Sequence, residues 1–173
     1  MAGNRSDAFV FFGASGDLAY KKIFPALQAM IRRDGMDIPI IGVARSGWTV
    51  EQLCGRAKES LEHNGGVDDK AFARLTSLLR YVDGDYNDAQ TYARLKTALK
   101  GSQRPLHYLA IPPSMFGRVV HGLADADCTD NARVIVEKPF GRDLASAQAL
   151  NRTLHEVFPA QSIFRIDHYL GKE

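Results

Sequence analysis

The sequence predicts an α/β protein with a doubly wound, mostly parallel sheet of six strands and helices on both faces. Short apolar runs alternate with longer amphipathic segments, which is the pattern of parallel strands joined by right-handed helical crossovers. A glycine-containing turn directly follows the first apolar run, where such folds bend from strand to helix. The chain has 173 residues, 45% of them hydrophobic, and contains no internal repeat or interdomain linker, so we expect one domain over residues 1–173.

The apolar runs are the expected strands. They cover residues 8–12, 38–44, 81–83, 106–111, 133–137 and 162–166. Pro39 can be accommodated only near the start of its strand, and Pro112 with Pro113 halts the fourth run. In a doubly wound sheet, ligands bind outside the carboxyl ends of the strands. Functional residues are therefore expected just after each run.

The amphipathic segments carry helix start signals. Residues of the Ser, Thr, Asp or Asn type precede four of them, at Thr49 (with Gln52), at Asp68 or Asp69, at Asn87 (with Gln90) and at Ser114. The last helix is traced by apolar residues between 144 and 157. In the first helix, Pro25 removes a backbone donor and clashes one turn back, so this helix should kink or restart near Lys22.

Composition excludes several classes of function. The chain has 22 basic and 20 acidic residues, a balance that gives no support to a nucleic-acid partner or a membrane-surface role. Cys54 and Cys128 fit neither a disulfide framework nor a metal-binding spacing, which favours free thiols in a reducing compartment and no metal. No segment approaches the roughly 20 apolar residues of a membrane span. We expect a cytoplasmic protein.

The turn after the first strand has the pattern G-x-x-G-x-x-A. It comprises Gly13, Ala14, Ser15, Gly16, Asp17, Leu18 and Ala19. Glycines let the backbone approach a pyrophosphate, whose charge is stabilised by the amides of a helix N-terminus. An ordinary strand-to-helix loop is the alternative, but the position after an unbroken apolar strand favours a dinucleotide. Lys21 and Lys22 lie just past the turn, either as solvated charges or with Lys22 reaching a phosphate.

The residues after the second strand indicate which dinucleotide binds. An NAD-binding domain would place an acid here to bind the ribose 2′-hydroxyl, but the chain reads Ala44, Arg45, Ser46. Arginine can form charge-assisted hydrogen bonds to a 2′-phosphate and stack on adenine. Arg45 could instead be a surface charge. The pattern favours NADP, with Arg45 and Ser46 as its contacts.

Five segments together resemble the glucose-6-phosphate dehydrogenase family, in order and in spacing, over essentially the whole chain. They read GASGDLA at 13–19, ARS at 44–46, YLAIPP at 108–113, EKPFG at 137–141 and RIDHYLGKE at 165–173. The resemblance implies a Rossmann domain that binds NADP. It further implies oxidation of glucose 6-phosphate at C1 to 6-phosphogluconolactone, the entry step of the oxidative pentose phosphate pathway.

The resemblance also implies roles for individual residues. Lys138 would position both substrate and cofactor and act in catalysis, and Pro139 would follow a cis bond. Asp167 would orient the catalytic histidine. The substrate phosphate would be bound by His168, Tyr169 and Lys172. Further cofactor contacts would come from Asp85, Tyr86, Tyr108, Ala110 and Pro112.

The chain departs from the family pattern mainly in what it lacks. None of its histidines fits the catalytic base, which would lie beyond residue 173 in a catalytic and oligomerisation domain absent from this chain. The parent enzyme would be a homo-oligomer through that domain, and residues 1–173 alone would bind NADP without turnover. Tyr20 replaces a basic residue often found before the two lysines. The alternatives are a stand-alone NADP-binding module without catalysis and a related sugar or polyol dehydrogenase.

Overall fold

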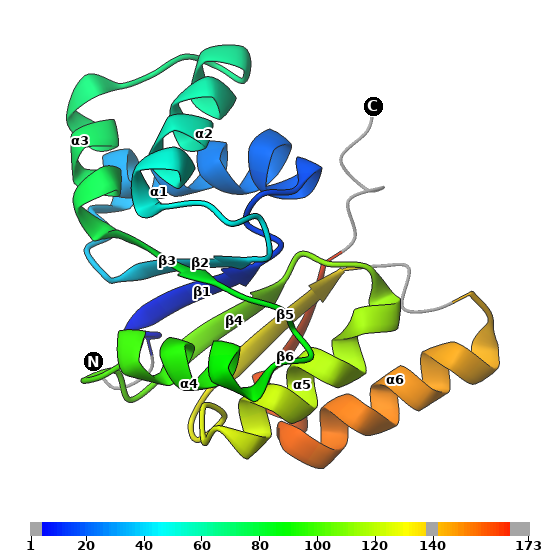
Figure 1. The fold of residues 1–173 in the computed structure, drawn as a ribbon. Coiled ribbons are helices and arrows are strands. Elements are labelled where there is room, and N and C mark those ends of the chain that lie inside the picture. The colour runs from blue at the N-terminus through cyan, green and yellow to red at the C-terminus, as the bar shows by residue number, and fades with distance from the viewer. Residues whose placement is uncertain (1–4, 138–141, 167–173) are drawn as a thin grey trace.

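The structure is a computed structural model that describes residues 5–137 and 142–166. Its centre is a six-stranded sheet in the order β3-β2-β1-β4-β5-β6, with every neighbouring pair parallel (Figure 1). The strands are β1 (Ala8–Phe12), β2 (Ile40–Ala44), β3 (Leu79–Asp83), β4 (Pro105–Leu109), β5 (Arg133–Glu137) and β6 (Ile163–Ile166). The predicted doubly wound sheet is confirmed.

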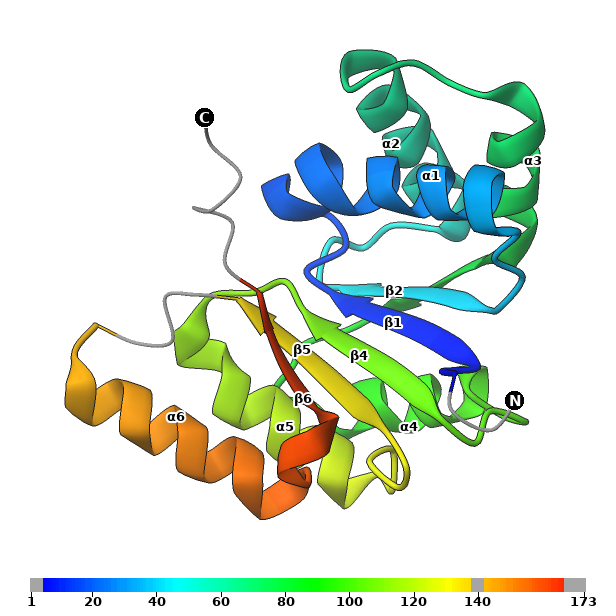
Figure 2. The same cartoon turned by 180° about the vertical axis from the view of Figure 1, so that it is seen from behind.

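Helices cover both faces of the sheet. One face carries α1 (Phe24–Asp34), α2 (Val50–His63) and α3 (Asp69–Leu78), and the other carries α4 (Ala89–Ala98), α5 (Phe116–Asp125) and α6 (Leu144–Val157) (Figures 1 and 2). A π-helix over Ala19–Ile23 precedes α1, and short 3-10 turns over Pro113–Met115 and Ala160–Ser162 precede α5 and β6. The helical layers exclude water from both sides of the central strands.

The apolar strands are continuous because both of their faces are buried. In β1, Val10 and Phe12 pack under α4 to α6, whereas Phe11 between them packs under α1 to α3. β2 repeats this alternation, with Ile41 and Val43 on the first side and Ile40 on the second. Because successive side chains of a strand point to opposite faces of the sheet, each strand contributes side chains to two separate cores.

Several predicted boundaries shift. β2 begins at Ile40 rather than at residue 38, and the carbonyl of Pro39 accepts a hydrogen bond from the Phe9 N–H just outside the strand. β3 begins two residues earlier than predicted, because Leu79 leaves α3 and pairs with Ile40. β4 ends at Leu109, before the predicted end at residue 111.

The helix starts show which capping signals act. The Thr49–Gln52 capping box is confirmed in both directions, and Asp68 caps α3. Asp88 rather than Asn87 caps α4, since the Asp88 carboxylate accepts from the Gln90 N–H. The prediction for Ser114 is wrong, because a 3-10 turn intervenes and α5 begins at Phe116 without a side-chain cap.

The first helix restarts as predicted. The π-helix ends at Ile23, and α1 begins at Phe24 with Pro25 in its first turn, where a missing N–H costs nothing. At its other end α1 stops at Gly35, which has φ +64° and ψ +32°. The chain then turns back to β2.

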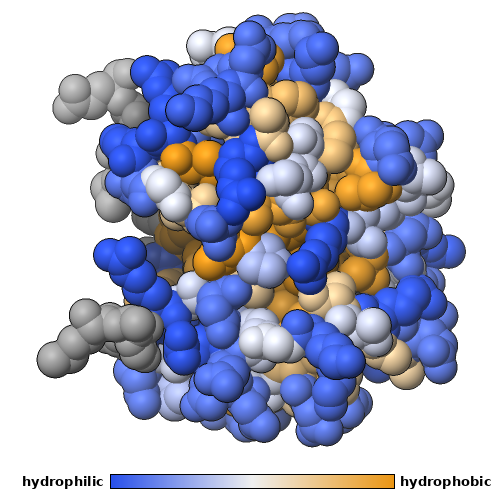
Figure 3. Space-filling view, turned by 90° about the vertical axis from the view of Figure 1, so that its left-hand side faces the viewer, coloured by the Kyte–Doolittle hydropathy of each residue, from blue (hydrophilic) through white to orange (hydrophobic). Residues whose placement is uncertain are grey.

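The face at the amino ends of the strands is shown in Figure 3. Apolar side chains gather there at the level of the sheet, between the hydrophilic surfaces of the two helical layers. The residues expected to bind ligands follow the opposite, carboxyl ends of the strands. The candidate site therefore lies at the edge of the sheet that faces away from this view.

Candidate functional site

The carboxyl ends of β1, β2, β3 and β4 form the edge where the predicted cofactor residues meet. The strand order reverses between β1 and β4, since β2 and β3 lie on one side and β5 and β6 on the other. Such a switch point leaves a crevice beyond the strand ends, because the two flanking crossovers run in opposite directions. The glycine turn, the turn after β2 and the loop after β4 converge there.

Gly13 makes a close approach of two backbones possible. Its φ is +83°, and a Cβ at this position would lie 2.2 Å from the carbonyl oxygen of Ala110. Ala110 follows β4, so the missing side chain lets the glycine turn pack against the neighbouring loop. Gly16 is exposed at the outer side of the turn. This arrangement fits a pyrophosphate, which needs a backbone free of side chains at a helix start.

The base of the glycine turn is tied to β2 and to Tyr86. The Gly13 N–H donates to the Val43 carbonyl at 2.9 Å and to the Tyr86 hydroxyl at 2.8 Å, and that hydroxyl donates to Val43 at 3.2 Å. Tyr86 is 8% exposed, and burial raises the pKa of its phenol to about 12. The Tyr86 hydroxyl thus supports the turn from within. Its predicted contact with the cofactor stays a prediction.

Arg45 projects from the carboxyl end of β2. Its side chain is 75% exposed, and its Nη1 lies 3.0 Å from Asp85 Oδ2. The Asn87 N–H, followed by the charge of Arg45, lowers the pKa of Asp85. Ser46 reaches across to the glycine turn, where its Oγ donates to Ser15 Oγ at 2.6 Å. The structure therefore brings together the predicted residues 15, 45, 46 and 85.

Asp83 is a residue of this edge that the sequence prediction does not name. Its Oδ1 accepts hydrogen bonds from the N–H groups of Ser46 at 3.1 Å and Gly47 at 2.8 Å, and from the Tyr81 hydroxyl at 2.7 Å. The Tyr81 hydrogen bond is the main cause that lowers the pKa of Asp83. An acid at the last position of a strand next to β2 is the sequence signal that could have indicated it.

The start of the first helix is braced by α2. The Tyr20 carbonyl accepts from the Ser60 hydroxyl, and its phenol contacts His63 Nδ1. The Arg56 guanidinium lies 4.1 Å from the centre of the Tyr20 ring. The predicted cofactor residue Lys22 follows in the same π-helix and is exposed. Tyr20 therefore takes a structural role at the position where the family pattern often has a base.

The three predicted cofactor residues at the end of β4 and in the loop after it lie in different environments. Tyr108 is largely buried, and its hydroxyl donates to a carboxylate oxygen of Glu137 at the end of β5. Burial, with Glu137 as the second cause, raises the pKa of Tyr108. Ala110 packs its carbonyl against Gly13, whereas Pro112 is exposed. Tyr108 thus links β4 to the strand end from which residues 138–141 continue.

The predicted substrate and catalytic residues lie outside the described residues. These are Lys138, Asp167, His168, Tyr169 and Lys172. The strands that lead to them are neighbours, because Glu137 of β5 pairs with Ile166 of β6. The last described residues before the two predicted segments are therefore adjacent in the sheet.

Four histidines lie among the described residues. His63 ends α2 against Tyr20, and His121 and His155 lie on α5 and α6. His107 is fully buried within β4, with Nε2 2.9 Å from the Cys128 carbonyl. None of these four follows a strand at the carboxyl edge.

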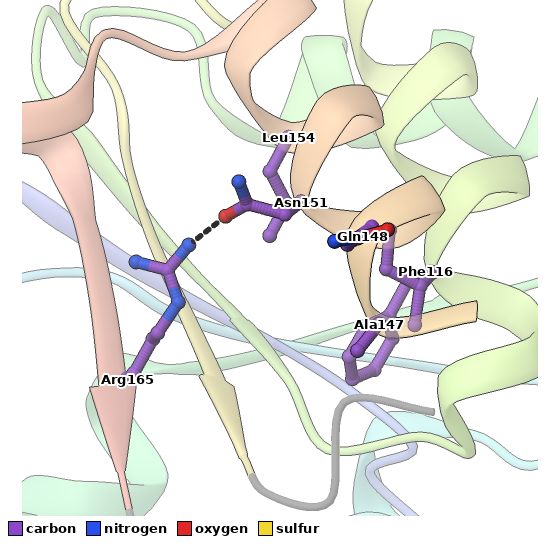
Figure 4. A pocket seen from close by; sticks show the side chains of 7 residues that line it. Phe116, Ala147, Gln148, Asn151, Leu154 and Arg165 are labelled. Atoms are coloured by element: carbon purple, nitrogen blue, oxygen red, sulfur yellow. Dashed lines mark hydrogen bonds between the residues drawn. The ribbon is translucent and has the colours of Figure 1, made fainter. Parts of the chain in front are cut away.

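A separate pocket of about 240 Å³ lies between α5, α6 and β6 (Figure 4). Its lining is Phe116, Ala147, Gln148, Leu150, Asn151, Leu154 and Arg165. In the close view Arg165 extends from β6 toward α6, where its guanidinium donates to the Asn151 side-chain oxygen. None of these residues belongs to the predicted cofactor site.

Residues 5–137 and 142–166 contain neither a cluster of metal-ligating side chains nor a membrane-spanning helix. Within these ranges, no three His, Cys, Asp or Glu side chains come together as metal ligands, and no helix is long and apolar enough to cross a bilayer. Cys54 and Cys128 are both free thiols; Cys128 is buried and Cys54 is partly buried.

Residues 10–173 match the family described as "Glucose-6-phosphate dehydrogenase, NAD binding domain". The chain belongs to this family. It is 44% identical over 171 residues to glucose-6-phosphate 1-dehydrogenase 1 of Mycobacterium tuberculosis, covering 99% of this chain and 37% of that protein. It is 39% identical to the enzyme of Saccharomyces cerevisiae, covering 94% and 35%. The family resemblance predicted from the five segments is confirmed.

Two solved structures share the fold. Glucose-6-phosphate 1-dehydrogenase from Mycobacterium avium matches with a TM-score of 0.90 and 46% identity, covering 96% of this chain and 37% of that one. A glucose-6-phosphate dehydrogenase "in complex with its substrate glucose-6-phosphate" matches with a TM-score of 0.85 and 40% identity, covering 99% and 39%. The chain thus spans little more than a third of the length of these relatives.

Proposed function

We propose that residues 1–173 are the cofactor-binding domain of a cytoplasmic, NADP-dependent glucose-6-phosphate dehydrogenase. The parent enzyme would oxidise glucose 6-phosphate at C1 to 6-phosphogluconolactone in the pentose phosphate pathway. The observation that carries the proposal is Arg45, which stands at the end of β2 beside a glycine turn that admits no Cβ at Gly13. Family membership supports the same reaction.

Arg45 is suited to the 2′-phosphate of NADP. A guanidinium carries five N–H donors in a planar fork, so an ion pair with Asp85 leaves donors for a phosphate. Its high exposure keeps it accessible to a ligand in the crevice. Ala44 precedes it, so the position from which an acid would bind the 2′-hydroxyl of NAD has no carboxylate.

The substrate part of the proposal rests on residues that follow β5 and β6. Lys138 would contact both ligands, while His168, Tyr169 and Lys172 would bind the sugar phosphate as point charge and fixed donors. Asp167 would orient a histidine that takes the C1 hydroxyl proton. Bound NADP would supply the hydride acceptor. The base and the oligomer interface would come from beyond residue 173.

The test of cofactor choice is a calorimetric titration of this chain with NADP and with NAD. Wild type is expected to bind NADP more tightly, and Arg45→Ala should weaken NADP about 10- to 100-fold, the range expected for lost charged hydrogen bonds. NAD affinity should change little. The matched control is Arg152→Ala, which removes an exposed arginine from α6. Equal affinity for the two cofactors, or tighter NAD, would refute the proposal.

The test of catalysis uses the same protein with NADP and glucose 6-phosphate. We expect binding but no appearance of NADPH absorbance, because none of the four described histidines follows a strand at the carboxyl edge. Steady NADPH production by residues 1–173 would show that the base lies within them.

A further inference from the structure

A single carboxylate oxygen fastens the turn after β2 to β3. Asp83 is the last residue of β3 and pairs in register with Ala44, the last residue of β2. Its Oδ1 accepts hydrogen bonds from the N–H groups of Ser46 and Gly47 and from the hydroxyl of Tyr81. The 45–47 turn, meaning residues 45, 46 and 47, therefore leaves the sheet already bound to the neighbouring strand.

The turn depends on this acceptor. Beyond Ala44 it is exposed, and Gly47 has a positive φ of +66°. Two successive N–H groups that point at one acceptor form a concavity suited to an anion. In this chain the Asp83 carboxylate takes the place of such a bound anion. A backbone that would otherwise be solvated is held in one conformation.

Arg45 stands between two anchored residues. Ala44 on one side is in the sheet, and Ser46 on the other is held by Asp83 through its N–H and reaches Ser15 through its hydroxyl. The Arg45 side chain itself is largely exposed and contacts Asp85. The direction of the Arg45 Cα–Cβ bond is therefore set by the anchored turn, and with it the region that the guanidinium can reach.

The hydrogen bonds of Asp83 argue against a direct cofactor contact. An acid that binds the ribose of NAD lies at the end of the second strand, whereas Asp83 lies at the end of the third. Its Oδ1 faces the backbone of the turn and the Tyr81 hydroxyl. A ligand of a ribose group that both cofactors carry, such as the 3′-hydroxyl, would affect NADP and NAD alike, but an anchor for Arg45 would affect the 2′-phosphate.

We propose that Asp83 is a positioning residue that makes this chain selective for NADP, acting through the 45–47 turn. The inference rests on the proposed function and names a residue that sets its specificity. Asp83 fixes the turn through hydrogen bonds, the fixed turn positions Arg45, and Arg45 binds the 2′-phosphate that distinguishes NADP from NAD. Ser46 extends the same support to the glycine turn through Ser15.

The experiment compares wild type with Asp83→Ala and Asp83→Asn by titration with NADP and NAD. Asp83→Ala should weaken NADP about tenfold while NAD stays within about twofold, the size expected for one well-placed charged contact. Asp83→Asn keeps an acceptor oxygen for the turn and should recover most of the NADP affinity. Asp130→Ala, which removes an exposed acid from the 126–132 loop, is the matched charge control.

Trp48 gives a second readout without cofactor. It is the only tryptophan of the sequence and directly follows the 45–47 turn. Acrylamide quenching of its fluorescence should increase in Asp83→Ala and stay near wild type in Asp83→Asn. If Asp83→Ala does not fold, Tyr81→Phe removes one of the three donors and should produce a smaller loss that is again specific to NADP.

The outcomes separate the inference from the proposed function. A wild type without preference for NADP would refute the proposed function and this inference with it. A wild-type preference that survives in Asp83→Ala would refute the inference alone. Parallel losses of NADP and NAD affinity would make Asp83 a ligand of a group that both cofactors share. Unchanged Trp48 quenching in Asp83→Ala would show that the turn does not depend on Asp83.

Discussion

At the scale of single residues, the candidate site depends on a glycine without a side chain as much as on its polar side chains. Gly13 allows two backbones to meet, and its N–H is shared between Val43 and the Tyr86 hydroxyl. The space that a Cβ would need is filled by the Ala110 carbonyl, which is backbone and cannot rotate away. A pyrophosphate would approach this same stretch of chain.

Gly13→Ala should therefore be more harmful than an ordinary glycine replacement. The matched control is Gly35→Ala, which has a similar positive φ of +64° but nothing within 4 Å of the added Cβ. We expect Gly35→Ala to lower the free energy of unfolding by about 1–2 kcal/mol, and Gly13→Ala by about 3 kcal/mol or more because a clash is added. Urea unfolding measures both. Equal losses would mean that the Ala110 contact is relieved cheaply.

At the scale of elements, local signals decide where helices begin when a side chain can reach the free N–H groups. The Thr49–Gln52 box starts α2 at Val50, three residues after the end of the 45–47 turn. A second box, from Asp143 and Ser146, starts α6 and was not predicted. In contrast, α5 begins after a proline turn without any side-chain cap. The four side-chain caps of the described helices thus share one feature, an extended backbone at the N-cap residue itself.

Thr49→Ala tests the cap of α2. It removes the acceptor for the Gln52 N–H and should lower the free energy of unfolding by about 1 kcal/mol. Thr49→Ser keeps the hydroxyl and is expected to retain most of that stability. Chemical denaturation of the two variants provides the measurement. A loss of the same size in both would assign the effect to the methyl group rather than to the cap.

At the scale of the whole molecule, the sheet buries a titratable group between its core layers. His107 is fully buried in β4, and its Nδ1 has no hydrogen-bond partner among the described residues. Burial lowers its pKa from 6.5 to about 4, despite the Cys128 carbonyl near Nε2. The folded protein therefore holds this imidazole neutral under conditions in which the unfolded chain would protonate it.

The sign of the resulting pH dependence follows from linkage. The unfolded chain binds the proton more readily, so stability falls as pH drops below about 6.5 and levels off near the folded pKa. Between about pH 7.5 and 5 this group should remove about 2 kcal/mol from the free energy of unfolding. His107→Leu should flatten the profile in that window, whereas His155→Gln on the surface of α6 should not. Superimposable profiles for His107→Leu and wild type would contradict the assignment.

Much of the site could be predicted because strand ends and turn residues are adjacent in the sequence. The glycine turn and Arg45 each follow an apolar strand directly, and parallel strands bring such residues to one edge. The contacts of Asp83 could not be predicted in the same way. Its partners Ser46 and Gly47 lie on a different crossover, and they meet it only because β2 and β3 pair in the register Ala44 to Asp83.

The alternation of apolar runs and amphipathic segments was enough to predict the number of strands, their order along the chain and the candidate cofactor edge, because these depend on local periodicity and on residues next to each strand. The packing of strands against one another decided the rest. It extended the third strand back to Leu79, brought the Tyr86 hydroxyl to the Gly13 N–H and brought the Asp83 carboxylate to the N–H groups of the 45–47 turn. Such contacts join residues about 36 to 73 positions apart, so they arise only when the sheet is assembled.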